Sequence, residues 1–146
     1  MRGICGRTLD ETFDADGFYP TGDLGSLDVD GYLWYQGRLD DMFKVKGATV
    51  YPEEVEAALK AHPDVFDAVV VGVPDERWGE RVVAVVQPRD GMALSLDVLQ
   101  AHAQSHVARY KVPRQLHVTD EIPRTPVGKP DYRWARATAM DHADAG

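Results

Sequence analysis

Two apolar runs constrain the fold of this chain more than any other feature: "VFDAVVVGV" at residues 65–73 and "RVVAVVQP" at residues 81–88. Both runs are rich in valine, and proline or glycine lies at their boundaries. Short β-branched runs of this kind are typical of strands that are buried on both faces. The sequence therefore predicts two neighbouring core strands, with helices covering the faces of their sheet.

Shorter segments on either side complete a small α+β domain. Before the two runs, residues 42–51 predict a hairpin, and Pro52 suits the first turn of a helix. After them, Ser95 is expected to cap a second helix, and a short strand is expected at residues 114–120. A last helix is expected over about residues 130–139. This order of elements predicts a short sheet with helices packed on it.

The composition argues against several classes of protein. A formal net charge of -8 is opposite in sign to the basic surface of nucleic-acid-binding proteins. No apolar run approaches the length that spans a bilayer, and Met1 is not followed by a signal-like stretch. Cys5 is the only cysteine, and the histidines lack the spacing of a metal site. We therefore expect a reduced cytoplasmic protein without a transmembrane segment, an internal disulfide or a bound metal.

Three polar segments concentrate the residues that could do chemistry: "GFYPTGDLG", "GRLDDMFKVKGATVYPEEVE" and "PRTPVGKPDY". Taken singly, each has an ordinary explanation. Asp23 could be a turn aspartate, and Lys129 a solvated lysine. Arg38 and Asp40 could form a surface ion pair, which is a common arrangement for such neighbours. Their order along the chain makes a functional interpretation more specific.

Together these motifs resemble the C-terminal end of the adenylate-forming superfamily, the AMP-dependent synthetases and ligases. The motifs are Thr-Gly-Asp at 21–23, Gly-Arg-x-Asp at 37–40, Lys-x-x-Gly at 44–47, Pro-x-Glu at 52–54 and Gly-Lys at 128–129. The resemblance covers about residues 12–139 and is strongest to the acyl-CoA and acid–CoA ligases. It implies a C-terminal lid domain at residues 42–146 and a hinge at 38–41. Residues 1–37 would then be the closing strands, a short β remnant, of a large N-terminal domain that this chain lacks.

Enzymes of this superfamily join a carboxylate to the α-phosphate of ATP, and a thiol then displaces AMP from the acyl-adenylate. The resemblance implies that Lys129 is the catalytic cation of the first step, in which two anions must meet. Opposite charges about 4 Å apart gain roughly 4 kcal/mol at an intermediate dielectric. We expect Pro130 to be the first helical residue, so that the helix N-terminus adds to the anion site beside Lys129.

The other motif residues are expected to serve other parts of the same reaction. The resemblance makes Asp23 the ligand of the ribose hydroxyls, and Arg38 a second contact to the nucleotide. Asp40 would be the hinge about which the lid rotates after adenylation. Lys44 would then lie near the reacting carbonyl in the thioester step. Gly47 would leave room for the pantetheine arm of CoA, since any side chain would obstruct it.

Some residues have a simpler expectation. From its spacing alone, Lys44 could equally be an exposed hairpin lysine. Lys46 is expected to be solvated, and Trp78 is expected to pack against the connection between the two core strands. Glu53 and Glu54 are expected to be favourable charges at a helix start, not a catalytic pair.

The resemblance also implies the substrates and the partner domain. ATP with Mg²⁺ would be bound mostly by the missing N-terminal domain, with CoA as co-substrate and a carboxylic acid to be activated. The phosphate loop and the acyl pocket of the family are absent from this sequence, so we expect the chain alone to be inactive. Two alternatives stay open: an adenylation domain that acts on a carrier protein, and a non-catalytic interaction module that kept the fold.

Overall fold

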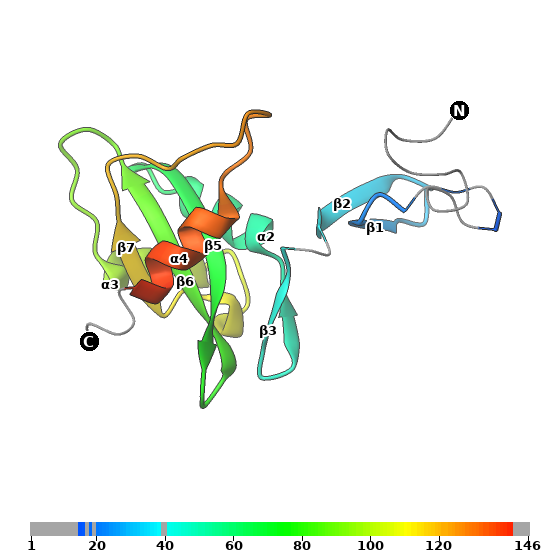
Figure 1. Ribbon diagram of the computed structural model, residues 1–146, viewed down its shortest axis with the longest axis horizontal. Coiled ribbons are helices and arrows are strands. Elements are labelled where there is room, and N and C mark those ends of the chain that lie inside the picture. The colour runs from blue at the N-terminus through cyan, green and yellow to red at the C-terminus, as the bar shows by residue number, and fades with distance from the viewer. Residues whose placement is uncertain (1–14, 17, 19, 39–40, 142–146) are drawn as a thin grey trace. The chain divides into compact units, whose positions relative to one another are not determined.

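The computed structural model of the 146-residue chain describes residues 15–16, 18, 20–38 and 41–141. It divides into two compact units, residues 1–40 and residues 41–146. The described part of the first unit is an antiparallel hairpin of β1 (Asp23–Leu27) and β2 (Leu33–Arg38) (Figure 1). The expected hinge residue Asp40 lies outside the described residues, so the assignment of the hinge stays a prediction.

The second unit confirms the expected α+β fold, with a five-stranded sheet and three α-helices in its described part. Its elements are β3 (Phe43–Val45), β4 (Ala48–Val50), α2 (Pro52–Lys60), β5 (Val65–Asp75), β6 (Gly79–Pro88), α3 (Leu96–Gln104), the 3₁₀ turn η1 (Arg109–Lys111), β7 (Gln115–Val118) and α4 (Tyr132–Asp141). Strand β6 is central, because it pairs with β5, with β3 and, in parallel, with β7. The order hairpin, helix, two strands, helix, strand, helix is the predicted one.

Strands β5 and β6 form a long antiparallel ladder that extends beyond the two apolar runs. The register runs from Val65 opposite Pro88 to Asp75 opposite Gly79. The ladder continues into the expected polar connection because the Asp75 carboxylate closes a tight turn. Its Oδ1 accepts hydrogen bonds from the backbone N–H groups of Arg77 at 2.9 Å and Trp78 at 3.0 Å.

Alternate residues of this ladder face two separate cores, which confirms that both faces are buried. On one face, valines of β5 and β6 pack with residues of α2 and α3; on the other, they pack with α4 (Figure 1). The first core includes Val55, Leu59, Val70, Val82, Ala84, Val86, Leu99 and Ala103. The second includes Val69, Val71, Val83, Val85, Ile122, Ala135 and Ala139.

The first two helices of this unit begin where the sequence predicts. Pro52 starts α2, and the Ser95 hydroxyl caps α3 by accepting a hydrogen bond from the Val98 N–H at 3.4 Å. The predicted start of α4 at Pro130 is wrong by two residues. Asp131 precedes α4, and its carboxylate accepts a hydrogen bond from the Trp134 N–H at 3.0 Å.

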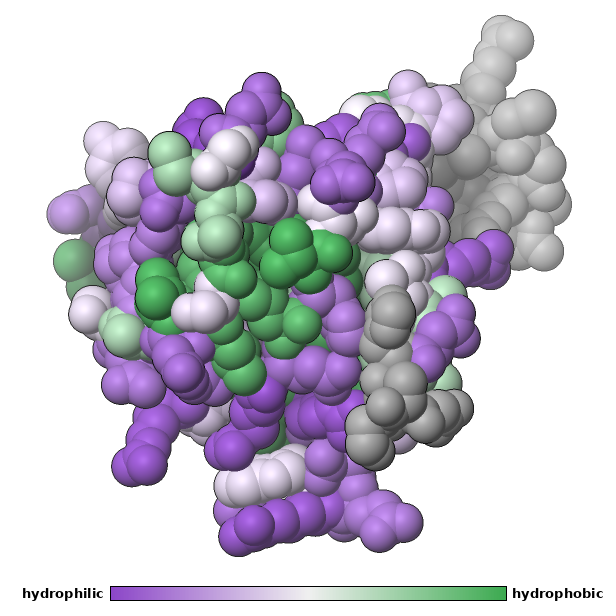
Figure 2. All heavy atoms as spheres, turned by 90° about the vertical axis from the view of Figure 1, so that its left-hand side faces the viewer, coloured by the Kyte–Doolittle hydropathy of each residue, from purple (hydrophilic) through white to green (hydrophobic). Residues whose placement is uncertain are grey.

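The surface of the second unit is hydrophilic around a central apolar area on the face that Figure 2 shows. Large apolar side chains that are exposed in residues 41–141 are Phe66, Met92, Val98, Tyr110, Val118, Val127 and Met140. No helix in the described ranges is both long enough and apolar enough to cross a membrane.

Gly72 allows β3 to lie against β5, and its replacement tests this close approach. A Cβ atom added at Gly72 would lie 2.5 Å from Cγ of the buried Phe43 ring, far inside contact distance. We expect Gly72→Ala to lower the free energy of unfolding by about 1–3 kcal/mol, the usual cost of overpacking. Urea unfolding of the chain measures this loss. The loss should shrink in a Phe43→Leu background, and an equal loss in both backgrounds would contradict the steric explanation.

Candidate functional site

Lys129 lies in a tight, hydrogen-bonded turn that precedes α4. Arg124 and Pro130 form an isolated antiparallel bridge across the base of the turn. Inside it, the Thr125 N–H donates to the Lys129 carbonyl at 2.7 Å, and the Gly128 N–H donates to the Thr125 carbonyl at 2.8 Å. Gly128 has φ of 84°, the left-handed conformation that favours glycine. The exposed Lys129 side chain therefore extends from an ordered backbone.

The turn is not followed directly by a free helix N-terminus. Asp131 already caps α4 with its carboxylate, so a negative group stands where the sequence led us to expect helical N–H groups for a bound anion. The Thr125 hydroxyl is buried and, within the described residues, makes no hydrogen bond. Positive charge at this turn consequently comes from side chains, with Lys129 as its exposed amine.

The Lys-x-x-Gly motif forms the β3–β4 hairpin, with Gly47 in the turn as predicted. Lys44 lies in β3 opposite Thr49, and its side chain is exposed. Lys46 and Gly47 both have positive φ, 50° and 80°. No atom lies within 4 Å of a Cβ built on Gly47. Within this unit alone, the backbone conformation and not crowding therefore explains the glycine.

Trp78 ties this hairpin to the turn between β5 and β6. The Lys46 N–H donates to the Trp78 carbonyl at 2.8 Å, and Lys46 Nζ lies 3.7 Å from the centroid of the indole ring. The Arg114 guanidinium lies 4.0 Å from the same ring, and that of Arg77 lies 5.1 Å away. Lys46 is exposed, as expected, and its ammonium in addition lies over the indole ring. Trp78, which was expected to pack against the connection between β5 and β6, packs against the first core and also gathers three cations, which the sequence did not reveal.

The Lys129 turn and the β3–β4 turn lie at opposite ends of the second unit (Figure 1). Figure 1 shows the loop before α4 at the top of the unit and the tip of the β3–β4 hairpin at the bottom. A reacting group held at one turn is therefore remote from the other. One fixed pose of this unit cannot present both lysine-bearing turns to the same atom.

The first unit brings together the two residues expected to bind nucleotide. Asp23 and Arg38 are opposite each other in the β1–β2 ladder. Arg38 Nη1 lies 3.1 Å from Asp23 Oδ1, and the two side chains are 31% and 40% exposed, respectively. The Asp23 N–H also donates to the Thr21 hydroxyl at 3.2 Å. An ion pair this exposed contributes at most about 1 kcal/mol, so a ligand could rearrange it at little cost.

A buried carboxylate that the sequence did not single out lies between α2, β5 and α4. Glu56 is only 3% exposed. Its Oε1 accepts the Val70 N–H at 3.0 Å, and its Oε2 accepts the Tyr132 hydroxyl at 3.0 Å. Burial raises the pKa of Glu56 from 4.5 to about 7, although both hydrogen bonds oppose that rise. Burial and, next, the nearby Glu56 charge also raise the pKa of Tyr132, the first residue of α4.

A second buried acid, Asp67 of β5, pairs with Arg124 at the base of the Lys129 turn. Asp67 lies in the run predicted to be buried on both faces, which is the signal that could have singled it out, whereas nothing in the sequence distinguishes Glu56 from a solvated acid. No set of three or more His, Cys, Asp or Glu side chains in the ranges that the structure covers is arranged to hold a metal ion.

The family comparison matches residues 54–129 to the AMP-binding enzyme C-terminal domain. A medium/long-chain-fatty-acid–CoA/3-oxocholest-4-en-26-oate–CoA ligase of Mycolicibacterium smegmatis is 55% identical over 115 residues, which cover 79% of this chain and 21% of the relative. An indoleacetate–CoA ligase of Aromatoleum aromaticum is 45% identical over 114 residues, covering 78% of this chain and 22% of the relative. This chain thus spans about a fifth of the length of the curated relatives that it matches.

Solved structures with the same fold include members that form adenylates. The o-succinylbenzoate CoA synthetase MenE of Bacillus subtilis, in complex with its acyl-adenylate intermediate, aligns with a TM-score of 0.82 and 33% identity. That alignment covers 89% of this chain and 27% of the synthetase chain. The amide bond synthetase McbA of Marinactinospora thermotolerans aligns with a TM-score of 0.78 and 41% identity, covering 84% of this chain and 25% of its own.

The buried Glu56 predicts a pH dependence of stability with a definite sign. Its pKa is higher in the folded chain, about 7, than its ordinary value of 4.5, so the folded state holds a proton that the unfolded state releases. The free energy of unfolding should therefore fall as pH rises from about 4.5 to 7, by up to about 3 kcal/mol. Glu56→Gln lacks this titration, so its stability relative to wild type should increase across the same window.

Urea unfolding of wild type and Glu56→Gln at several pH values between 4 and 8 measures the difference. Glu76→Gln, in the exposed turn between β5 and β6, is the matched control and should follow the wild-type pH dependence. A difference between wild type and Glu56→Gln that stays constant with pH would show that Glu56 does not titrate in this window.

Proposed function

Because this chain belongs to the family of AMP-binding enzyme C-terminal domains, we propose that it is the lid domain of an AMP-forming acid–CoA ligase. The observation that carries this proposal is the pair of lysine-bearing turns at opposite ends of one folded unit. A ligase of this family needs one cation for adenylate formation and another arrangement for thiol attack. Identity of 55% to a fatty-acid–CoA ligase supports CoA as the acceptor.

In the first half-reaction, Lys129 is proposed to bridge the carboxylate of the acid and the α-phosphate of ATP. The ordered turn holds the Lys129 backbone, so only side-chain freedom has to be lost when the amine meets its anions. An ammonium group between the two anions stabilises the charge that concentrates in the transition state. Mg²⁺ and most of the ATP contacts would belong to a larger adenylating domain.

In the second half-reaction, the lid is proposed to rotate about Asp40 and present the β3–β4 turn instead. The thiol of CoA attacks the acyl carbonyl, and AMP departs with the bonding electrons of the broken C–O bond. Lys44 would lie near the carbonyl and the departing AMP, while Gly47 leaves the path of the pantetheine arm open. Lys46, Arg77 and Arg114 around Trp78 form a positive surface suited to the phosphates of CoA.

The β1–β2 hairpin is proposed to be the closing part of the adenylating domain, with Asp23 and Arg38 contacting the nucleotide. Large apolar side chains of this hairpin are exposed, among them Tyr32 at 69%, Leu33 at 72% and Trp34 at 62%. Contiguous exposed apolar residues of this size indicate a surface that packs against another folded part. We propose residues 1–37 as this part, residues 38–41 as the hinge and residues 42–146 as the lid.

The named relatives act on fatty, steroid-derived and indole-containing acids, so we propose a hydrophobic carboxylic acid as the substrate. A second candidate function keeps the adenylation step but transfers the acyl group to another acceptor. The likeness to an amide bond synthetase favours an amine as that acceptor, and a carrier-protein thiol is the other choice. Supplying the complete enzyme with acyl-adenylate and each acceptor in turn distinguishes these from CoA.

The division of labour between the two turns predicts a split effect of Lys129→Ala. In the complete ligase, we expect adenylate formation to fall by about 100-fold or more, since a charge aimed at the transition state is lost. Thioester formation from supplied acyl-adenylate should stay within about twofold of wild type, because the turn that carries Lys129 would be rotated away. The two half-reactions are measured separately, by pyrophosphate exchange and by thioester formation. Lys60→Ala, an exposed lysine at the end of α2, is the control.

The hinge assignment predicts a different split for Asp40. Proline fixes φ near −65° and also restricts the preceding Leu39, so Asp40→Pro should restrict rotation of the lid. If the fixed pose is the adenylating one, pyrophosphate exchange survives while thioester formation from acyl-adenylate collapses. Asp40→Ala leaves the backbone free and should be far milder. Wild-type rates of both half-reactions in Asp40→Pro would show that residue 40 is not the hinge.

A further inference from the structure

The side chain of Arg124, at the base of the Lys129 turn, contacts the turn itself. Its Nη1 donates to the Gly128 carbonyl at 3.1 Å, and its Nη2 pairs with Asp67 Oδ2. One planar guanidinium thus joins the residue before Lys129 to a strand of the central sheet. Because both donors belong to one rigid group, the position of Asp67 fixes the direction in which the carbonyl of residue 128 is held.

The Asp67 carboxylate is held in a fixed, buried position. Asp67 lies in β5, where the register with β6 shifts between Val65 and Asp67. At this irregularity Phe66 is 58% exposed, whereas Asp67 and Ala68 are 6% and 0% exposed. A bulge of this kind redirects side chains locally, and here it leaves a carboxylate buried at the sheet edge. The Ala68 N–H holds Asp67 Oδ1 at 2.9 Å, so Oδ2 is directed to the guanidinium.

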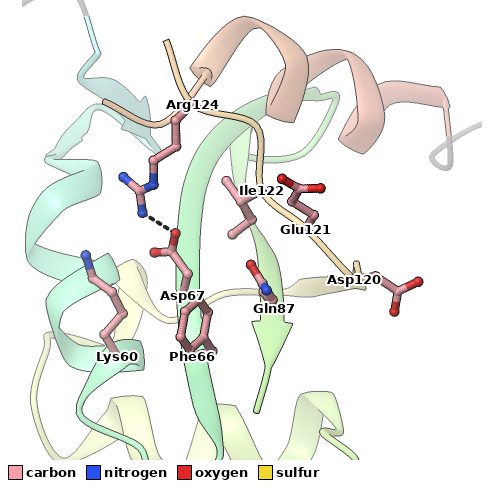
Figure 3. Close-up of a pocket in the computed structure, with 8 residues that line it drawn as sticks. All are labelled: Lys60, Phe66, Asp67, Gln87, Asp120, Glu121, Ile122 and Arg124. Carbon is pink, nitrogen blue, oxygen red and sulfur yellow. Dashed lines mark hydrogen bonds and ion pairs between the residues drawn. The ribbon is translucent and has the colours of Figure 1, made fainter. Parts of the chain in front are cut away.

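Figure 3 shows that Arg124 points to Asp67 across a hollow of the surface. Lys60 of α2, Ile122 and Glu121 line the same hollow. The Asp120 and Glu121 carboxylates lie farther along the loop, and the dashed contact joins Arg124 to Asp67. Among the residues drawn, Asp67 is therefore the acid that holds the guanidinium.

We propose that the Asp67–Arg124 ion pair positions the Lys129 turn for adenylate formation. The inference rests on the proposed function, since it assigns the pair a purpose through the catalytic role of Lys129. Arg124 touches no reacting atom; it acts on the backbone next to the lysine. Without it, the turn keeps its own two hydrogen bonds but loses its connection to β5.

The burial of Asp67 explains why this pair matters more than an ordinary surface ion pair. The Arg124 side chain is 44% exposed, but that of Asp67 is 8% exposed. A pair with one buried member is screened less by water, and deleting the arginine leaves a buried carboxylate without its counter-charge. Misplacement of a catalytic group by about 1 Å lowers a rate by up to about 100-fold. We therefore expect Arg124→Ala to lower adenylate formation by roughly 10- to 100-fold.

The enzymatic test uses the complete ligase and separates the two half-reactions. Arg124→Ala should lower kcat for pyrophosphate exchange with little change in KM, and spare thioester formation from supplied acyl-adenylate. Arg124→Lys keeps the charge but lacks the two parallel N–H donors of the guanidinium, so its rate of pyrophosphate exchange should lie between those of wild type and Arg124→Ala. Asp67→Asn combined with Arg124→Ala should be no worse than Arg124→Ala alone, because both changes break one contact. Arg89→Ala removes another arginine bound to a backbone carbonyl, that of Pro63 at 2.9 Å, and is the matched control.

A second measurement needs only the present chain. Hydrogen exchange at the amides of Thr125 and Gly128 should accelerate by about tenfold or more in Arg124→Ala, since the turn opens locally more often. Exchange of core amides such as that of Val85 should be unchanged. Unchanged exchange in the turn would overturn the inference, and so would equal loss of both half-reactions, which indicates general unfolding. If Lys129→Ala is inactive in adenylate formation but Arg124→Ala is normal, the inference about Arg124 is wrong and the proposed function stands. If Lys129→Ala forms adenylate at the normal rate, both the proposed function and the inference are wrong.

Discussion

The antiparallel pairing of β5 with β6 is the interaction on which the rest of the second unit depends. Valines at successive positions face opposite sides, so the same ladder forms the floor of two cores, one under α2 and α3 and one under α4. Hydrophobic burial on both faces makes this pair rigid. The other elements of the unit attach to the pair directly or, as β4 does, through β3. Both lysine-bearing turns are carried by this rigid body, so they move together.

Strand β5 lies at an edge of the sheet, and the buried acids follow from that position. An edge strand has N–H groups without strand partners, which a folded protein has to satisfy or cover. The Glu56 carboxylate covers the Val70 N–H and continues to the Tyr132 hydroxyl at the start of α4. Asp67, on the same strand, extends to the arginine that contacts the Lys129 turn. The buried carboxylates of Glu56 and Asp67 therefore connect β5 to α4 and to the loop before α4.

Much of the fold was predictable because it rests on local patterns. Valine-rich runs identify β5 and β6, and Pro52 and Ser95 identify two helix starts. Prediction from the sequence was less complete where a contact with another residue determines the local structure. Helix α4 begins at Tyr132 and not at Pro130, because the Asp131 carboxylate just before it accepts a helical N–H. Lys46 stays exposed but lies over the Trp78 ring, a contact that the spacing of residues cannot show.

The residues of the candidate site likewise fall into those that the sequence identifies and those that only the structure reveals. Motif order alone selected Lys129, Lys44 and Gly47, and the structure adds how their turns are held. It also shows Asp23 beside Arg38, a pairing that the ladder of β1 and β2 brings about. Glu56 could not have been selected, since it lies in "PEEVE" among helix-start charges, whereas Asp67 is an acid within the predicted core strand and could have been noticed there. Their function is visible only through burial and through partners in α4 and the loop before it.

Because the two lysine-bearing turns lie far apart, the rigidity of this unit can keep each of them ordered independently of the other. A flexible domain could bring either lysine to a substrate by local bending, but each approach would lose the order that makes a positioned cation effective. A rigid body with one turn at each end avoids this loss, because the proposed rotation would exchange the turns without disturbing either. The two turns are stiffened by different means, Trp78 and its cations for the β3–β4 hairpin and Asp67 with Arg124 for Lys129. Since neither set shares a residue with the other, one turn can be altered while the geometry of its counterpart is preserved.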